Sequence, residues 1–467
     1  MKIILIEPGS PGFHVFSKYP IPRLGLPMIG TILRNMGHEV TILCEDILAK
    51  SRRSIDWSQI FSSDLVGIST ITSTAPKAYA IADKVREKKV PVVIGGPHVT
   101  FLPDEALEHC DYVVRGEGEK TMVEFIQVLE DTDSKAMSDV CGLSFREGTK
   151  IRHNPPRSLM TEKVWETLPY PDLTLIEEHE KIRITPIMTS RGCPFHCKFC
   201  SVTPMFGRKY RRRSIESVIA EIKEKNPKQI FFCDDNFAAD IRRSKQLLQK
   251  MKEEKIIRPW SAQIRTDATK DKEFLELSKK TKCFLFQIGM ESINPATLVD
   301  YDKNQEVSDI IRSNNILRKY GIRTHGMFVL GSDSDNTQTI KDTVKFAIEN
   351  KIFTVQLLVL IPLPGTETFQ ELDAEGRIFT KDWSLYDGHH VVFEPKKMTV
   401  YQLQRESFLA MKKFYSIWKC LSYLLTFRVI KAYFSYIGHQ IVKQWGKSNK
   451  TMIKNLKERF SHPRRTT

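Results

Sequence analysis

Short runs of apolar residues recur along the first part of the chain, separated by amphipathic stretches. Helices are predicted between the runs, at about residues 24–36 and 75–88. The runs have the length of strands and are continuous, which is typical of a parallel sheet covered by helices on both faces. The pattern therefore predicts a doubly wound α/β domain, whose ligand site lies beyond the carboxyl ends of its strands. The expected strands are 2–7, 39–44, 65–69, 90–94 and 112–115.

A second α/β series begins at about residue 182. Helical patterns lie between its strands, for example at 214–225 and 307–320. Six strand–helix units in succession predict a partial (β/α)6 barrel, with the chemistry at the carboxyl ends of the strands. The expected strands are 182–189, 229–233, 261–264, 284–289, 323–330 and 354–361.

The chain of 467 residues is too long for one ordinary domain. The two series place a doubly wound domain at residues 1–130 and the barrel at 181–400. A polar, proline-containing linker is expected at 131–180, and a helical extension at 401–467.

The composition is that of a globular protein, with 41% hydrophobic and 27% charged residues. No apolar run reaches the roughly 18 to 20 residues of a spanning helix, and the amino terminus lacks the features of a signal peptide. Six of the nine cysteines are scattered singly, which argues against a disulfide framework. Together these features favour a cytoplasmic protein.

Most of the net charge of +15 lies in the helical extension. From Val400 onward the chain has fourteen Lys and Arg residues against two Glu, a local charge of +12. Apolar and aromatic residues from Met411 to Ile437 fall at helical spacings among these cations. Such a segment either caps the barrel or lies on the surface of an anionic membrane, and nucleic acid is the least favoured partner. Residues 443–467 are polar and are expected to fray.

Three cysteines lie within eight residues, directly after the first strand of the second series. Cys193, Cys197 and Cys200 form a Cys-x3-Cys-x2-Cys pattern. Three thiolates can hold three irons of a [4Fe-4S] cluster, so that the fourth iron is left open for another ligand. An open coordination position is typical of a catalytic site. The alternative is a structural zinc site that uses His196 together with the cysteines.

This motif on the first loop of a six-unit series resembles the signature of the radical S-adenosylmethionine (SAM) superfamily. The preceding domain resembles the cobalamin-binding domain of the branch that contains class B methyltransferases and the magnesium-protoporphyrin ester cyclase. The resemblance covers about residues 1–400. It implies that SAM chelates the open iron and is cleaved to methionine and a 5′-deoxyadenosyl radical, which abstracts hydrogen from an unactivated carbon. It also implies an external electron donor such as a flavodoxin or ferredoxin.

The resemblance further implies SAM contacts at the other strand ends. Asp234 and Asp235 follow the second strand, where they are expected to pair with the ammonium group of SAM. Arg265, after the third strand, is expected to hold the carboxylate, and Glu291, after the fourth, to accept from the ribose hydroxyls. The backbones at 326–331 and 363–365 are expected to approach adenine.

The first domain departs from the best-known cobalamin pattern. Ser69, Gly95 and Gly96 match family positions that line the nucleotide tail. The Asp-x-His-x-x-Gly motif that supplies a lower cobalt ligand is missing, since residues 44–48 read Cys-Glu-Asp-Ile-Leu. Two interpretations follow: cobalamin bound without this histidine, or a domain that has lost the cofactor. His98, beside the glycine pair, is expected to be a turn residue.

Three functions fit these features. The first is cobalamin-dependent methylation of an unactivated carbon in a hydrophobic substrate such as a lipid. The second uses the same cofactors to form a ring or a carbon–carbon bond. The third, modification of RNA, is suggested by the basic extension, but the methylthiotransferases of that kind need a second cysteine trio near the amino terminus. Here Cys44, Cys110 and Cys141 are far apart.

Overall fold

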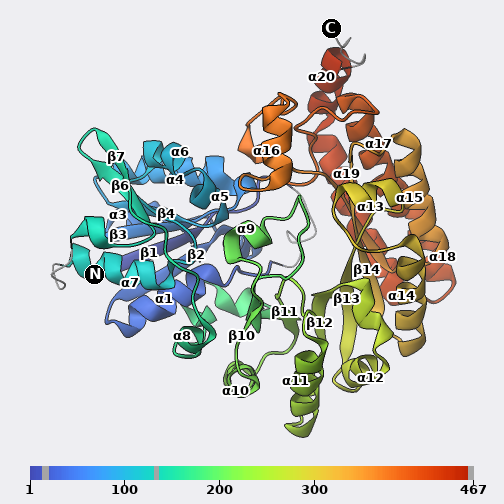
Figure 1. Cartoon of the computed structure of the whole chain (residues 1–467), viewed down its shortest axis with the longest axis horizontal. Helices are drawn as coiled ribbons and strands as arrows, with labels where there is room; N and C mark the ends of the chain where they lie inside the picture. Colours follow the sequence, from blue (N-terminus) through green and yellow to red (C-terminus); the bar gives the residue numbers. More distant parts are fainter. Residues whose placement is uncertain (13–19, 131–135, 461–467) are drawn as a thin grey trace.

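A computed structural model describes residues 1–12, 20–130 and 136–460. The first domain is built on a twisted sheet in the order β2-β1-β3-β4-β5-β6-β7, in which the first five strands are parallel. Helices α1 (Gly25–Asn35) and α7 (Gly118–Leu129) pack on one face, and α4 (Ala75–Arg86), α5 (Pro97–Phe101) and α6 (Pro103–His109) on the other (Figure 1). The doubly wound prediction is confirmed. The parallel strands are β1 (Lys2–Glu7), β2 (Glu39–Cys44), β3 (Leu65–Ser69), β4 (Val92–Gly95) and β5 (Tyr112–Val114), and the shorter helices are α2 (Glu45–Leu48) and α3 (Trp57–Phe61).

The segment expected as a linker contains a hairpin that extends the first sheet. Strand β6 (Leu143–Glu147) pairs antiparallel with β5, and β7 (Lys150–His153) pairs antiparallel with β6. The prediction missed this hairpin because it lies at the sheet edge, where β7 is largely exposed and carries charged residues. The first domain therefore extends beyond residue 130, and the short helix α8 (Glu162–Glu166) follows before the barrel begins.

The second domain contains six parallel strands in the order β15-β14-β13-β12-β11-β8, the partial barrel that the sequence predicted. Its helices begin and end where local signals place them. For example, the Ser214 side chain accepts a hydrogen bond from the Ser217 N–H at the start of α10 (Ile215–Lys225), and Gly321 ends α14 (Val307–Tyr320) in the left-handed conformation. The strands are β8 (Thr185–Ile187), β11 (Ile230–Phe232), β12 (Trp260–Ile264), β13 (Cys283–Glu291), β14 (Arg323–Leu330) and β15 (Thr354–Val359). The helices are α9 (Val202–Phe206), α10 (Ile215–Lys225), α11 (Ile241–Glu253), α12 (Lys272–Lys280), α13 (Pro295–Asp300), α14 (Val307–Tyr320), α15 (Thr337–Glu349) and α16 (Glu367–Ala374).

The carboxyl-terminal extension is helical and packs against the open edge of the barrel (Figure 1). It comprises α17 (Val400–Phe414), α18 (Ile417–Leu425), α19 (Val429–Ser448) and α20 (Lys450–Phe460). Strand β15 ends the sheet, and the Tyr415 hydroxyl donates to the Val355 carbonyl at 2.7 Å and accepts from the Val355 N–H at 2.9 Å. Of the placements that the sequence left open for this segment, the structure shows the cap on the barrel. The fraying expected from residue 443 is wrong as far as residue 460, because Trp445 and Phe460 are buried; residues 461–467 lie outside the described part.

Candidate functional site

The three cysteines lie together on the loop that follows β9 (Ser190–Arg191), a short strand paired with β10 (Arg211–Arg212). Gly192 begins this loop with φ +83°, and a Cβ there would lie 2.4 Å from the Lys209 carbonyl oxygen. Glycine is therefore required for the loop to fold against its neighbour. All three thiols are partly accessible, and burial raises their pKa values, that of Cys200 to about 12.

The donor set of this loop fits a cluster with one open iron. His196, the other candidate ligand, forms an ion pair with Glu367 at 2.9 Å between Nε2 and Oε1. The remaining donors are the thiols of Cys193, Cys197 and Cys200, which interact electrostatically with one another. Three thiolates match a [4Fe-4S] cluster that keeps one site for SAM.

Two predicted SAM contacts lie beside the cluster loop. The Arg265 guanidinium stacks on the Phe195 ring of that loop, 3.8 Å from its centroid. Glu291 has φ +56° and a buried ion pair of 2.8 Å with Lys303. Its carboxylate folds over Gly289, where a Cβ would lie 2.4 Å from Oε1. Because Arg265, Glu291 and Lys303 all act electrostatically on Cys197, the structure brings them to the same end of the barrel.

Asp234 and Asp235 follow β11 at this end, and they differ from each other. Asp234 is buried, and its Oδ1 accepts from the N–H of Thr189 at 2.9 Å and from the N–H and hydroxyl of Ser190. One oxygen thus fixes the strand before the cluster loop, while Oδ2 has no hydrogen-bond partner among the described residues. The Asp235 side chain is exposed at the surface. Surrounding protein atoms nevertheless displace part of its hydration, and this desolvation, together with the charge of Asp234, raises the pKa of Asp235 to about 6.

A cavity of about 270 Å³ lies beyond the parallel strands of the first domain, and it fits the nucleotide tail of cobalamin. Ser69, Gly95 and Gly96, the residues expected to contact the nucleotide tail, line this cavity together with Gly67 in β3. Glycine keeps this wall open: a Cβ would lie 2.7 Å from a Leu5 methyl at Gly67 and 2.3 Å from the Thr70 carbonyl at Gly96. Met205 and Phe206, on the helix after the cluster loop, line the same cavity, so it reaches from the sheet to the loop.

Two other predictions about cobalamin depend on the placement of this cavity. Residues 44–48, where the ligand motif was sought, are not among the lining residues, whereas Arg23 and Leu24 of the loop after β1 are. Residues 13–19 of that loop lie outside the described part. His98 is buried in α5, where it packs edge-on against Trp383 and pairs with Glu105. His98 therefore has a structural role. It lies in a helix, however, and not in the turn that the sequence predicted.

A buried ionic cluster joins the two domains at the cluster loop. Glu117 accepts from Arg211 at 2.8 Å and from Arg191 at 3.3 Å, and Glu119 accepts from Arg191 at 2.5 Å. Arg191 directly precedes Gly192. The glutamates follow β5 of the first domain, and all four side chains are less than 9% exposed. The sequence predicted that a strand ends at residue 115, just before these glutamates, but it gave no sign of their partners in the second domain.

The barrel encloses a further cavity of about 450 Å³. Apolar side chains form most of its wall, while Gln287, His325 and Gln356 project into it from neighbouring strands. Burial lowers the pKa of His325 to about 4, so its ring is neutral at physiological pH. Helices α17 and α19 close the cavity with Met411 and Ile441 among others.

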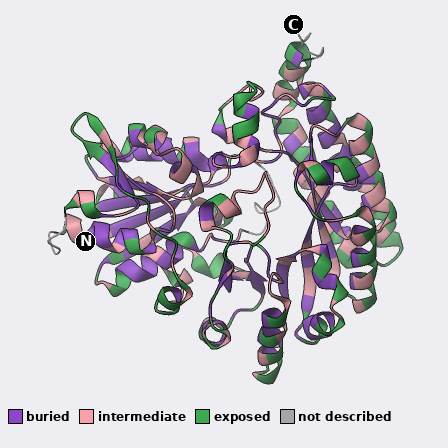
Figure 2. Ribbon diagram, viewed as in Figure 1, coloured by how far each residue is buried: buried purple, intermediate pink, exposed green. Residues whose placement is uncertain are grey.

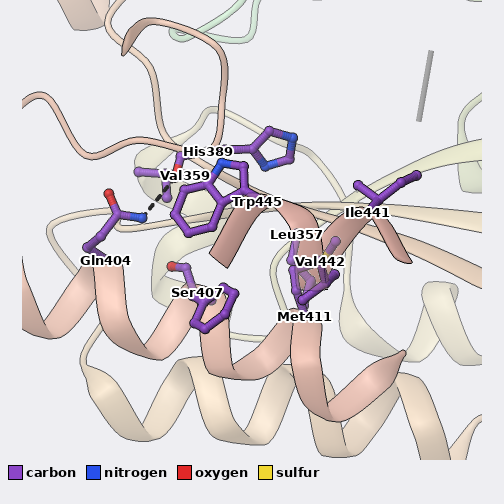
Figure 3. Close-up of a pocket in the computed structure, with 10 residues that line it drawn as sticks. Leu357, Val359, His389, Gln404, Ser407, Met411, Ile441, Val442 and Trp445 are labelled. Carbon is purple, nitrogen blue, oxygen red and sulfur yellow. Dashed lines mark hydrogen bonds between the residues drawn. The ribbon is translucent and has the colours of Figure 1, made fainter. Parts of the chain in front are cut away.

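Met411 and Ile441 also line a smaller adjoining cavity between the same helices, shown in Figure 3. There the Gln404 amide donates to the His389 carbonyl at 2.8 Å and holds α17 against the loop after β15. The extension therefore forms part of the wall of both cavities. Its inward face was visible in the sequence as a helical pattern, but its role in enclosing a cavity was not.

Comparison with known proteins identifies both domains. Residues 16–126 match the family model described as B12 binding domain, and residues 187–362 match that of the radical SAM superfamily. An uncharacterized methyltransferase of Pyrococcus horikoshii is 31% identical over 87% of this chain and 90% of its own length. The chain belongs to the cobalamin-binding radical SAM family. It is therefore a radical SAM enzyme, and the family uses a [4Fe-4S] cluster, SAM and cobalamin, as the sequence predicted.

Other family members differ in chemistry. The bacteriochlorophyllide d C-12(1)-methyltransferase of Chlorobaculum tepidum is 31% identical over 85% of this chain and 83% of its own length. The anaerobic magnesium-protoporphyrin IX monomethyl ester cyclase of Cereibacter sphaeroides is 29% identical over 72% of this chain and 57% of its own length. Among solved structures, the cobalamin-dependent enzyme OxsB matches with a TM-score of 0.69 at 16% identity, covering 96% of this chain and 75% of its own. This structural similarity supports the two-domain fold described above. No helix in the described residues is long and apolar enough to cross a membrane.

Proposed function

We propose that this family member methylates an unactivated carbon of a hydrophobic substrate. The observation that carries the proposal is the cavity in the barrel, which is mostly apolar and has a few amide and imidazole groups to orient a ligand. Hopanoid C-2 and C-3 methylases, which share 25% and 24% identity with this chain, support a substrate of this class. When bound, the cluster with SAM supplies a carbon radical and cobalamin supplies the methyl group.

The side chains of this site have two roles in the proposal: they position the cluster and SAM, and they neutralise the charged groups of SAM. Cys193, Cys197 and Cys200 are the candidate ligands of the cluster, and Arg265, stacked on the cluster loop, is the candidate to bind the SAM carboxylate. The unpaired Oδ2 of Asp234 is the candidate acceptor for the SAM ammonium group. Glu291, held by Lys303, is the candidate acceptor for the ribose hydroxyls.

The cavity lies in the amino-terminal half of the barrel, since lining residues such as Arg183, Gln229 and Thr354 lie at or before the starts of the strands. Gln287, which lines it, precedes Glu291 by four residues on β13, about 13 Å along a strand. A substrate bound there reaches the end of the barrel where the cysteines lie only if it extends about this distance beyond the cavity. Helices α17 and α19 exclude water from its other side.

The deciding experiment is anaerobic quantification of both SAM products with reconstituted enzyme and a lipid extract. Substrate-dependent S-adenosylhomocysteine and 5′-deoxyadenosine in equal amounts are expected. Deoxyadenosine alone would refute methylation and favour the ring- or bond-forming chemistry of the cyclase relative. Replacing each cluster cysteine by alanine is expected to abolish both products. Continued deoxyadenosine formation by the triple variant would contradict the cluster assignment.

A further inference from the structure

The corner between α18 and α19 exposes apolar side chains to solvent. Trp418 is 77% exposed, Leu425 82% and Phe427 90%. Figure 2 shows mostly exposed residues where Figure 1 labels α18, at the edge of the molecule. Of the thirteen large apolar side chains exposed in the described part of the chain, nine lie between residues 418 and 436. We name these nine the apolar corner: Trp418, Leu421, Leu424, Leu425, Phe427, Val429, Ile430, Tyr433 and Tyr436.

The residues of the apolar corner are not the ones that are buried where the helices pack. Cys420, Ala432 and Ser435 are buried, and the Cys420 thiol donates to the Ala432 carbonyl between α18 and α19, while the apolar corner is exposed. Phe427 has φ +56°, a left-handed conformation that favours glycine and is uncommon for an aromatic residue. The turn would form more readily with glycine, so the ring at its tip is not needed for folding.

Cations surround the apolar corner. Between Glu406 and Glu458 the chain has no Asp or Glu, so nothing on these helices offsets the positive charge. Burial, reinforced by neighbouring cations, lowers the pKa values of Lys419 and Lys431 to about 8. The cations of the corner and its surroundings are Lys412, Lys413, Lys419, Arg428 and Lys431, with Arg318 and Lys351 packed near Lys431.

Exposed apolar side chains surrounded by cations fit an anionic bilayer better than nucleic acid or a second copy of this chain. Aliphatic Leu, Val and Ile side chains gain nothing from contact with nucleic acid, and the surrounding cations would repel the same surface of a second copy. An anionic bilayer meets both requirements, because its headgroups attract the cations and its acyl boundary accepts the apolar side chains.

We propose that the apolar corner docks on an anionic lipid bilayer, with Phe427, Leu425 and Trp418 inserted at the headgroup boundary. The inner face of the same helix α19 lines the barrel cavity through Phe434, Ile437 and Ile441. Docking therefore places the wall of the cavity beside the bilayer. This deepens the proposed function, on which it rests, by naming membrane lipid as the substrate class.

The test is co-sedimentation of the full-length, cofactor-loaded enzyme with vesicles of phosphatidylcholine alone or mixed with phosphatidylglycerol. Binding to the anionic vesicles that weakens with salt is expected. A triple variant, Trp418→Ser with Leu425→Ser and Phe427→Gly, is expected to lose vesicle affinity by about tenfold or more. The matched control is Val299→Ser, since Val299 is an exposed apolar residue on α13, 78% exposed and outside the corner. Phe427→Gly alone is the second variant, because it removes the ring and leaves the turn intact.

Equal binding by the triple variant and Val299→Ser would overturn the proposal. So would a lipid-free dimer in gel filtration that the triple variant abolishes, or tighter binding to an RNA oligomer than to anionic vesicles. Product formation from detergent-dispersed lipid extract separates the two proposals. If docking alone fails, vesicle binding is absent while both SAM products form; if methylation alone fails, vesicle binding persists without S-adenosylhomocysteine.

Discussion

Removal of the Glu117 side chain is the strongest test of how the two domains are joined. The carboxylate is 5% exposed and accepts from Arg191, Arg211 and the Met160 N–H, the last at 2.7 Å. In Glu117→Ala, Arg191 keeps Glu119, but Arg211 retains only carbonyl partners and becomes a buried charge without a counter-ion. Breaking a buried pair in this way costs about 3 to 5 kcal/mol of unfolding free energy.

The assay is urea unfolding of the loaded enzyme, compared with Glu147→Ala. Glu147 pairs with Arg152 at 3.3 Å on the exposed hairpin, so its removal should cost about 0 to 1 kcal/mol. Glu117→Gln keeps the shape and removes the charge, and it should fall between the two. We also expect Glu117→Ala to form deoxyadenosine without matching S-adenosylhomocysteine, because the cavity of the first domain is no longer held against the cluster loop. If Glu117→Ala and Glu147→Ala unfold within about 1 kcal/mol of each other, the reasoning is refuted.

Further substitutions test the loop, the barrel cavity and the basic corner. Gly192→Ala should lower the iron bound after reconstitution, because its Cβ meets the Lys209 carbonyl, and an unchanged iron content would contradict this. Ile441→Trp should fill the barrel cavity and abolish substrate-dependent S-adenosylhomocysteine, whereas Gln444→Trp, at an exposed position of the same helix outside the apolar corner, should not; equal turnover would count against a substrate in the cavity. Vesicle binding should weaken as pH rises from 7 to 9, by about fivefold for each charge lost, because Lys419 and Lys431 are protonated below their pKa of about 8 and neutral above it. Arginine at both positions should remove that pH dependence, and a persistent dependence would show that other groups cause it.

The sequence predicted the elements that continuous apolar runs define. β1 and β3 have the predicted bounds, since both faces of these strands are covered and each run ends in a polar residue. The β6–β7 hairpin was missed because an edge strand exposed to solvent has no such run. Helix α20 was missed because few apolar residues mark its buried side.

The candidate site was predictable where the signal is local. The spacing of the cysteines and the glycines at the strand ends are properties of a few consecutive residues. The ion pairs of Glu117 with Arg191 and Arg211 join positions 74 and 94 residues apart, and no periodic pattern connects them. Asp234 was correctly placed at a strand end, but the engagement of its Oδ1 by the Thr189 and Ser190 backbone depends on how two loops meet.

The hydrogen bonds of Tyr415 to Val355 have a consequence for the design of deletions. A partial barrel has an unpaired edge, and the Tyr415 hydroxyl satisfies both backbone groups of one residue of that edge. Gly438 of α19 packs on the same ring so closely that a Cβ would lie 2.3 Å from it. Deleting the helices would therefore leave the edge strand unpaired and able to pair with other chains. The resulting aggregation would lower vesicle binding and could be mistaken for loss of a lipid-binding surface. The helices of the extension cover the open edge of the barrel. The lipid-binding role of their surface should therefore be tested by replacing side chains, because deletion would expose that edge.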